Sequence, residues 1–225
     1  MSKKKTPEAE AQTREELLAV ASRVFLRDGY EAASMKLIAD EADCTTGKLY
    51  SNYTKKEDFL AAFAKKLVSV NYSMTGVLLG EKEHPMMPYL LTTALVLETC
   101  SLNENFHELY YVGYSGKDTT RVFIEEHMVR IQPIMEQCGK GQSEDALFAN
   151  GLMIAGIVRS LVASEYIGAK MTFREKMKHF VFASMAILGF ETDDLSAILD
   201  SIVERKDAIH EAAYEIIIKT LSSKL

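Results

Sequence analysis

Apolar residues recur three or four positions apart along most of the chain, which is the spacing of amphipathic helices. The pattern predicts a first helix from Thr13, where Thr13 and Glu16 form a capping box. Short helices are predicted from Ser34 and from Thr45 or Thr46. A second capping box opens a long fourth helix over about 55–79.

The remainder of the chain shows the same spacing. A third capping box, Thr172 with Glu175, opens one of its helices. No stretch alternates apolar and polar residues as a half-buried strand does. The sequence therefore predicts an all-α fold of nine or ten helices, the later ones over about 86–101, 104–114, 118–137, 143–167, 172–188 and 192–221.

The segment 34–57 carries the pattern of a helix-turn-helix. Two short helices flank a tight break at Asp43-Cys44, and an apolar seam that includes Ile38 and Leu49 would hold them together. In such a motif the second helix enters the major groove of DNA. The outward residues are short donors and acceptors with one cation, which suit base edges and phosphates. A plain helical hairpin with a solvated polar face fits the same pattern.

Residues 13–63 resemble the DNA-binding domain of the TetR family of transcriptional regulators. The matching segments are Ala21-Ser-Arg-Val-Phe-Leu-Arg-Asp-Gly-Tyr30, Ser34-Met-Lys-Leu-Ile-Ala39, Gly47-Lys-Leu-Tyr-Ser-Asn-Tyr53, and Lys56-Glu57 followed by Leu60. The sequence departs from the family at Ala42-Asp43-Cys44-Thr45, where Ala-Gly-Val-Ser is usual. Asp43 tolerates the left-handed conformation that glycine would supply.

The low complexity of residues 1–12 predicts a disordered arm. The resemblance implies a three-helix helix-turn-helix domain over 13–58 and a larger helical domain over 59–225 for ligand binding and dimerisation. It implies base-reading roles within 46–52 and backbone-clamping roles for Tyr50 and Lys56. Together with the outward pattern, the candidate DNA-binding residues are Ser34, Lys36, Thr45, Thr46, Gly47, Lys48, Tyr50, Ser51, Asn52, Lys55 and Lys56.

Aromatic and methionine side chains are plentiful in the second domain, where they either fill the core or line a pocket. Apolar walls with a few polar groups are typical of small-molecule sites, and the resemblance favours a pocket. The candidate lining residues are Tyr72, Met74, Met87, His107, Tyr110, Tyr111, Tyr114, His127 and Met128.

Small residues between 146 and 164 allow two helices to approach closely. With the segment 172–188 they predict a homodimer interface that includes Gly151, Ala155 and Gly156. One short recognition helix contacts too few bases for specific binding, so a two-fold dimer on a palindromic DNA operator is expected.

Composition and the motifs that are absent narrow the expected location and function of the protein. The chain has 225 residues, a net charge of −6 and three scattered cysteines. Its longest apolar stretch, 151–158, is shorter than a membrane span, and no secretory signal follows the N-terminal lysines, so a cytoplasmic protein with no membrane contact is expected. No metal-ligand spacing, catalytic motif or cofactor motif occurs, so we expect neither an enzyme nor a bound cofactor.

The sequence thus predicts a ligand-responsive DNA-binding transcriptional regulator. The specific form is a repressor that a small, largely apolar ligand releases from its operator. Two alternatives stay open: a helical binding or scaffold protein without specific DNA binding, and a thiol-based redox sensor acting through Cys100 or Cys138.

Overall fold

The computed structural model describes residues 6–191 and 195–221. Helix α1 (Pro7–Asp28) begins well before the predicted start at Thr13. The Thr6 hydroxyl accepts a hydrogen bond from Ala9 N, and proline occupies the first helical position, where its missing N–H costs nothing. Residues 7–12 of the predicted disordered arm are therefore helical, and residues 1–5 lie outside the described part.

Two short helices follow, α2 (Met35–Glu41) and α3 (Thr46–Asn52). Ser34 and Thr45 cap them, each accepting a hydrogen bond from the backbone N–H three residues on. Asp43 lies in the turn between them with φ of 45°, the left-handed conformation expected from the sequence. Helix α4 (Lys56–Thr75) begins where Asp58 accepts hydrogen bonds from the N–H groups of Thr54 and Lys55, so Asp58 rather than Glu57 completes this cap.

Seven further helices complete the described chain: α5 (Met87–Leu102), α6 (Glu104–Ser115), α7 (Lys117–Gln137), α8 (Glu144–Ala163), α9 (Phe173–Ile187), α10 (Leu195–Glu204) and α11 (Lys206–Leu221). The described residues thus form eleven helices rather than nine or ten. The predicted helix over 192–221 is two helices that break at Arg205, and residues 192–194 lie outside the described part. The capping box of Thr172 and Glu175 is confirmed.

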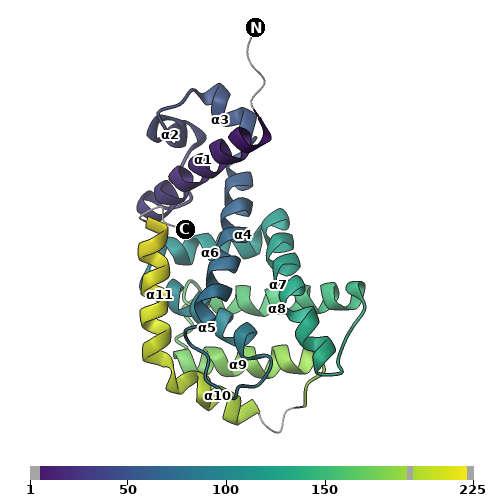
Figure 1. Ribbon diagram of the computed structural model, residues 1–225. Coiled ribbons are helices and arrows are strands. Elements are labelled where there is room, and N and C mark those ends of the chain that lie inside the picture. Colours follow the sequence, from purple (N-terminus) through teal and green to yellow (C-terminus); the bar gives the residue numbers. More distant parts are fainter. Residues whose placement is uncertain (1–5, 192–194, 222–225) are drawn as a thin grey trace.

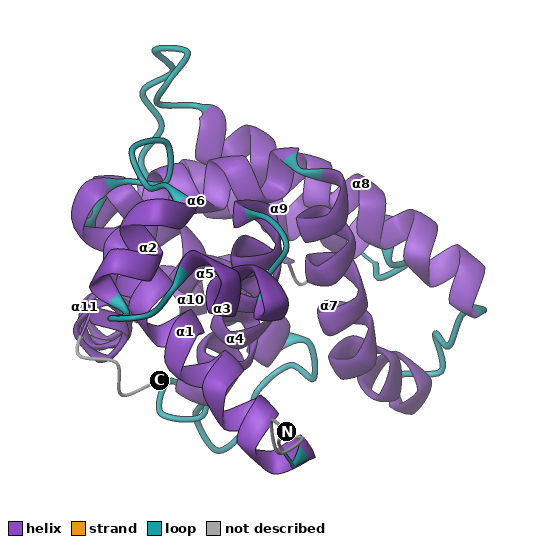
Figure 2. Ribbon diagram, turned by 90° about the horizontal axis from the view of Figure 1, so that it is seen from above, coloured by secondary structure: helices purple, strands orange, loops and turns teal. Residues whose placement is uncertain are grey.

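The three N-terminal helices form one end of the molecule, and α4 leads from them into the larger helical bundle (Figure 1). Helix α5 lies at the centre of that bundle, with almost all of its residues buried. It packs against α4, α6 and α11, while α8 and α9 pack on each other. Figure 2, seen from the N-terminal end, shows helices and loops only, in agreement with the predicted fold class.

Polar contacts fasten the N-terminal helices to the bundle. The carboxylate of Glu108 on α6 accepts hydrogen bonds from the backbone N–H groups of Tyr30 and Glu31, at 2.8 and 3.0 Å. One turn away, the amide of Asn105 donates to the carbonyl of Leu26 at 2.8 Å. These bonds satisfy backbone groups at the end of α1 and so fix its orientation on α6.

Candidate functional site: an exposed recognition helix and an internal cavity

Helix α3 presents a polar face at the free end of the molecule (Figure 1). Leu49 is fully buried and anchors the helix, while its neighbours Lys48 and Tyr50 are exposed. Of the eleven candidate DNA-binding residues, nine are exposed: Ser34, Lys36, Thr45, Thr46, Gly47, Lys48, Tyr50, Ser51 and Lys55. The structure therefore exposes most of the predicted residues to solvent.

Lys56 does not lie where the sequence predicted. Its ammonium group donates hydrogen bonds to the carbonyls of Tyr30 and Ala33, at 2.7 and 3.0 Å, and lies over the Tyr30 ring. The carbonyls of this loop have no helical partners, so they attract the nearest cation. Lys56 therefore holds the loop between α1 and α2 and is not free to clamp a phosphate.

Two other candidates are partly engaged. The amide nitrogen of Asn52 donates to the Lys48 carbonyl at 2.8 Å within α3. Lys55 lies 3.4 Å from Asp118 at the start of α7, but both side chains are more than half exposed, so this ion pair is weak and Lys55 can exchange it for a phosphate.

Arg14 was not predicted to belong to this surface. Its guanidinium group donates to the Asn52 carbonyl and lies 4.4 Å from the centre of the Tyr53 ring. The residue therefore positions the end of α3 against α1. Its role could not be read from spacing, because the contact joins segments 38 residues apart in sequence.

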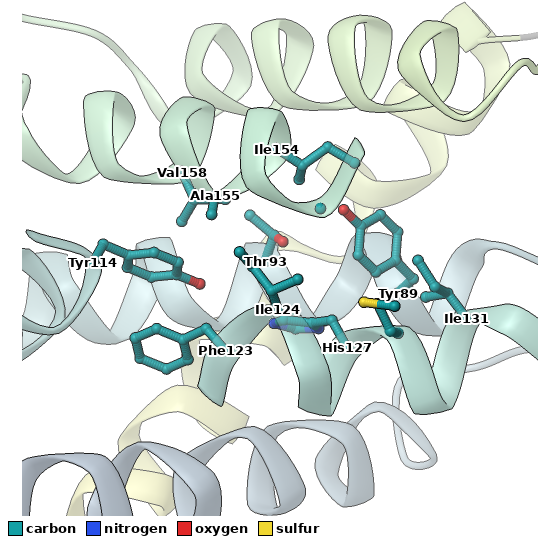
Figure 3. A pocket seen from close by; sticks show the side chains of 12 residues that line it. Tyr89, Thr93, Tyr114, Phe123, Ile124, His127, Ile131, Ile154, Ala155 and Val158 are labelled. Atoms are coloured by element: carbon teal, nitrogen blue, oxygen red, sulfur yellow. The ribbon is translucent and has the colours of Figure 1, made fainter. Parts of the chain in front are cut away.

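A small cavity lies inside the larger domain, between α5, α6, α7 and α8 (Figure 3). The space open to the centre of a water-sized sphere is about 30 Å³, which is room for one or two waters. Its wall is mainly apolar, and the polar groups are the hydroxyls of Tyr89, Thr93 and Tyr114 and the ring of His127.

His127 joins this cavity to α4. Its Nδ1 lies 3.2 Å from the hydroxyl of Tyr72 on α4, and its ring meets that of Tyr89 edge-on. Burial, followed by the charge of nearby Arg130, lowers the pKa of His127 to about 4. The ring is therefore neutral at physiological pH.

The predicted pocket residues divide into three groups. Tyr114, His127 and Met128 line the cavity, and Tyr72 touches it through His127. Met74, Met87 and Tyr110 are buried in the core without lining it. His107 and Tyr111 lie elsewhere, packed against Tyr166, with His107 also bonded to the Val162 carbonyl at 2.6 Å.

Sequence reasoning missed most of the cavity wall. Tyr89 and Thr93 lie in the nearly all-apolar segment of α5, where the sequence does not distinguish a cavity-facing side from the rest of the helix. Gly151 and Ala155, predicted at the dimer interface, line the cavity instead. A side chain at Gly151 would meet Ile124 at 2.8 Å, so this glycine serves the close approach of α8 to α7.

The opposite face of α8 is exposed and apolar. It carries Leu152, Met153 and Gly156, with Leu152 and Met153 each more than half exposed. A side chain added at Gly156 would meet nothing within 4 Å, so this residue alone of the three predicted interface residues faces outward. By length and composition α8 could also span a membrane, but it packs against α6, α7 and α9 as an element of the bundle.

The cysteines give no support to a thiol sensor. Burial raises the pKa of the Cys100 thiol, so it stays protonated and unreactive. Cys44 and Cys138 are half-buried, and none of the three forms a disulfide. Within residues 6–191 and 195–221, no three His, Cys, Asp or Glu side chains gather as metal ligands would.

Comparisons with known proteins agree with the helix-turn-helix and with the all-helical fold. Residues 17–63 match the model of bacterial regulatory proteins of the tetR family. No curated protein matches the chain. Among solved structures, TylP, a TetR regulator from Streptomyces fradiae, is 18% identical with a TM-score of 0.53 and covers 90% of this chain and 98% of its own.

Two further structures share the fold. A putative TetR-family regulator from Shewanella sp. PV-4 is 13% identical with a TM-score of 0.53, covering 77% of this chain and 97% of its own. One from Syntrophomonas wolfei is 18% identical with a TM-score of 0.52, covering 81% and 98%. Residues 17–63 thus match the tetR-family model, and the chain shares the helical fold of these TetR regulators.

Proposed function

We propose that this protein is a ligand-responsive repressor of the TetR family, which binds a palindromic DNA operator as a homodimer and is released when a small, largely apolar ligand enters the cavity. The observation that carries the proposal is α3, a short helix that buries Leu49 and exposes Thr46, Lys48 and Tyr50 at the free end of the molecule.

The exposed groups on α3 match the chemistry of a major groove. Lys48 is suited to guanine edges or phosphates, and the hydroxyls of Thr46 and Ser51 can bond to bases or to the backbone. Ser34 and Lys36 begin α2, which in this motif crosses the phosphate backbone. Asp40 and Asp43 add negative charge nearby. We therefore expect moderate affinity for each half-site and a need for two recognition helices.

The exposed apolar face of α8 supplies a surface for dimerisation. Leu152, Met153 and Gly156 lie on the side of α8 that faces away from the cavity. Burying such a face between two copies is favourable by about 25 cal/mol for each Å² of apolar surface removed from water. The same helix would then form the cavity wall on one side and the dimer interface on the other.

Helix α4 connects the two sites. It has 20 residues and spans about 30 Å at 1.5 Å per residue, with Lys56 beside the N-terminal helices at one end. Near the other end, Asn71 donates a hydrogen bond to the Tyr110 hydroxyl of α6, and Tyr72 contacts His127 of α7. A ligand that separates α7 from α8 would move these contacts and change the spacing of the two recognition helices.

Selection of bound sequences from a random pool of double-stranded DNA tests the proposal. The wild-type protein should enrich a palindrome whose half-sites are centred about 34 Å apart. The double variant Lys48→Ala, Tyr50→Ala should enrich nothing at the same salt concentration, while keeping the helical content of the wild type. A wild-type selection without an enriched sequence would support the scaffold alternative instead.

A further inference from the structure

The cavity contains polar groups that the folded chain leaves unpaired. Tyr89, Thr93 and Tyr114 are 3%, 4% and 6% exposed, yet among the described residues none of their hydroxyls forms a hydrogen bond. Figure 3 shows these hydroxyls directed into the space that the labelled side chains enclose. A hydroxyl that borders an internal cavity bonds to whatever occupies that cavity, so water or a ligand bound there can pair with these three groups.

The hydroxyls are hydrogen-bond donors at physiological pH. Burial raises the pKa of both tyrosine hydroxyls, so they stay protonated. By contrast, the buried hydroxyl of neighbouring Tyr110 already accepts a hydrogen bond from Asn71 at 2.9 Å. Two other buried side-chain atoms among the described residues lack a partner, the Tyr30 hydroxyl and Asn71 Oδ1, but neither residue lines the cavity.

None of the described residues that line the cavity has a charged side chain. The cation that acts on His127, Arg130, lies over the Tyr72 ring, and its guanidinium group donates to the Glu126 carboxylate at 2.8 Å. An anionic or cationic ligand would lose its hydration without gaining a counter-charge, which is strongly unfavourable. His127 supplies no charge either, because its ring is neutral.

We propose that the cavity selects an uncharged, mainly apolar molecule that carries a carbonyl-type oxygen, which accepts hydrogen bonds from the hydroxyls of Tyr89, Thr93 and Tyr114. This inference rests on the function proposed above and names the ligand class for the same cavity. The cavity has room for only one or two waters, so the ligand must displace the flexible Met128 side chain as it enters.

Four probes of similar size separate the possibilities: acetophenone, ethylbenzene, benzoate and benzylammonium. Their affinities for the full-length protein, measured by ligand-observed NMR at pH 7.5 without DNA, should rank acetophenone first by about threefold to tenfold, which is the gain from one net hydrogen bond. Benzoate and benzylammonium should bind at least tenfold more weakly. Ethylbenzene is the more hydrophobic of the two neutral probes, so burial alone would reverse their order.

Three variants locate the effect. Thr93→Val and Tyr114→Phe should each lower acetophenone affinity about threefold to tenfold, leave ethylbenzene affinity unchanged, and leave the melting temperature of the free protein equal or higher. A merely structural role would lower the melting temperature and the affinity for both probes. Tyr110→Phe is the matched control, because it removes a paired hydroxyl and should lower the melting temperature without changing the preference for acetophenone.

Equal affinities for acetophenone and ethylbenzene, tighter binding of a charged probe, or binding of no probe would each overturn the inference. Because these affinities are measured without DNA, they test the ligand class separately from operator release. Acetophenone that binds as expected but leaves operator affinity unchanged would contradict ligand release and keep the ligand class. A charged probe that releases the operator would contradict the ligand class and keep ligand release.

Discussion

His127 is the side chain through which the cavity and α4 are in contact. One face of the ring lines the cavity, and Nδ1 meets the Tyr72 hydroxyl at 3.2 Å. Because the folded-state pKa is about 4 and the ordinary value is 6.5, the unfolded chain binds more protons than the folded chain between these values. Stability supplied by this residue is therefore complete above pH 6.5 and falls as the pH decreases towards 4.

The pH dependence of unfolding tests this state of His127. Between pH 7 and 4.5 the wild type should lose roughly 2 kcal/mol more in unfolding free energy than His127→Phe does, since each pKa unit corresponds to about 1.4 kcal/mol. Urea unfolding at both pH values measures the difference, with His179→Phe at an exposed site as control. Identical pH dependence in wild type and His127→Phe would show that the ring is not buried in its neutral form.

Lys56 and Lys36 should differ in what they support. Lys56→Met removes two charge-assisted hydrogen bonds to loop carbonyls and should lower the unfolding free energy by roughly 2 kcal/mol. Lys36→Met, at an exposed site, should change stability by less than about 0.5 kcal/mol and weaken DNA binding. Chemical denaturation and operator titration distinguish the two variants. If both variants were equally stable, Lys56 would not hold the loop and would again be a candidate DNA-binding residue.

At the scale of helices, short sequence motifs predicted those helix ends and turns that depend on neighbouring residues alone. The Thr172 capping box and the left-handed turn at Asp43 depend on a few neighbouring residues, and both were predicted. The start of α1 was not, because Thr13 offered a complete capping box while the signal at Thr6-Pro7 lay in a polar, low-complexity segment. Inside α1, Thr13 bonds to the Ala9 carbonyl instead, as threonine does within helices.

The recognition helix gives a direct prediction. Lys48→Ala and Tyr50→Ala should each weaken operator binding by roughly 1–3 kcal/mol while leaving the melting temperature unchanged, because both side chains are exposed beside buried Leu49. Fluorescence anisotropy with the selected operator measures the affinities. Leu49→Ala should lower the melting temperature as well. Unchanged operator affinity in both surface variants would remove α3 from the DNA interface.

At the scale of the whole molecule, prediction from sequence stopped at contacts between distant segments. Helical periodicity marks which residues are inward but not which helix they meet, so His107 and Tyr111 were placed in the pocket although they pack against Tyr166. Small residues on α8 marked a close helix contact without telling whether the partner was α7 or a second copy. Gly151 serves the first contact, and Gly156 is available for the second.

The exposed face of α8 gives a prediction for assembly. Gly156→Arg would bury an unpaired charge between two copies, at a cost of several kcal/mol, and should convert the dimer to monomers at micromolar concentration. Ala208→Arg, on the exposed face of α11, should leave the dimer intact. Light scattering measures both masses. A monomeric wild type, or a Gly156→Arg dimer, would exclude this face as the interface.

Filling the cavity with a side chain tests the link between cavity and operator without any ligand. Ala155 is buried and lines the cavity, so the larger side chain of Ala155→Leu occupies the space a ligand would take and pushes α8 from α7. Overpacking lowers stability by about 1–3 kcal/mol, so the dimer must be confirmed by light scattering. The measurement is the operator affinity of Ala155→Leu against wild type, with Ala208→Leu as control. We expect at least a tenfold loss for the folded Ala155→Leu dimer, whereas an unchanged affinity would contradict coupling between the cavity and the recognition helices.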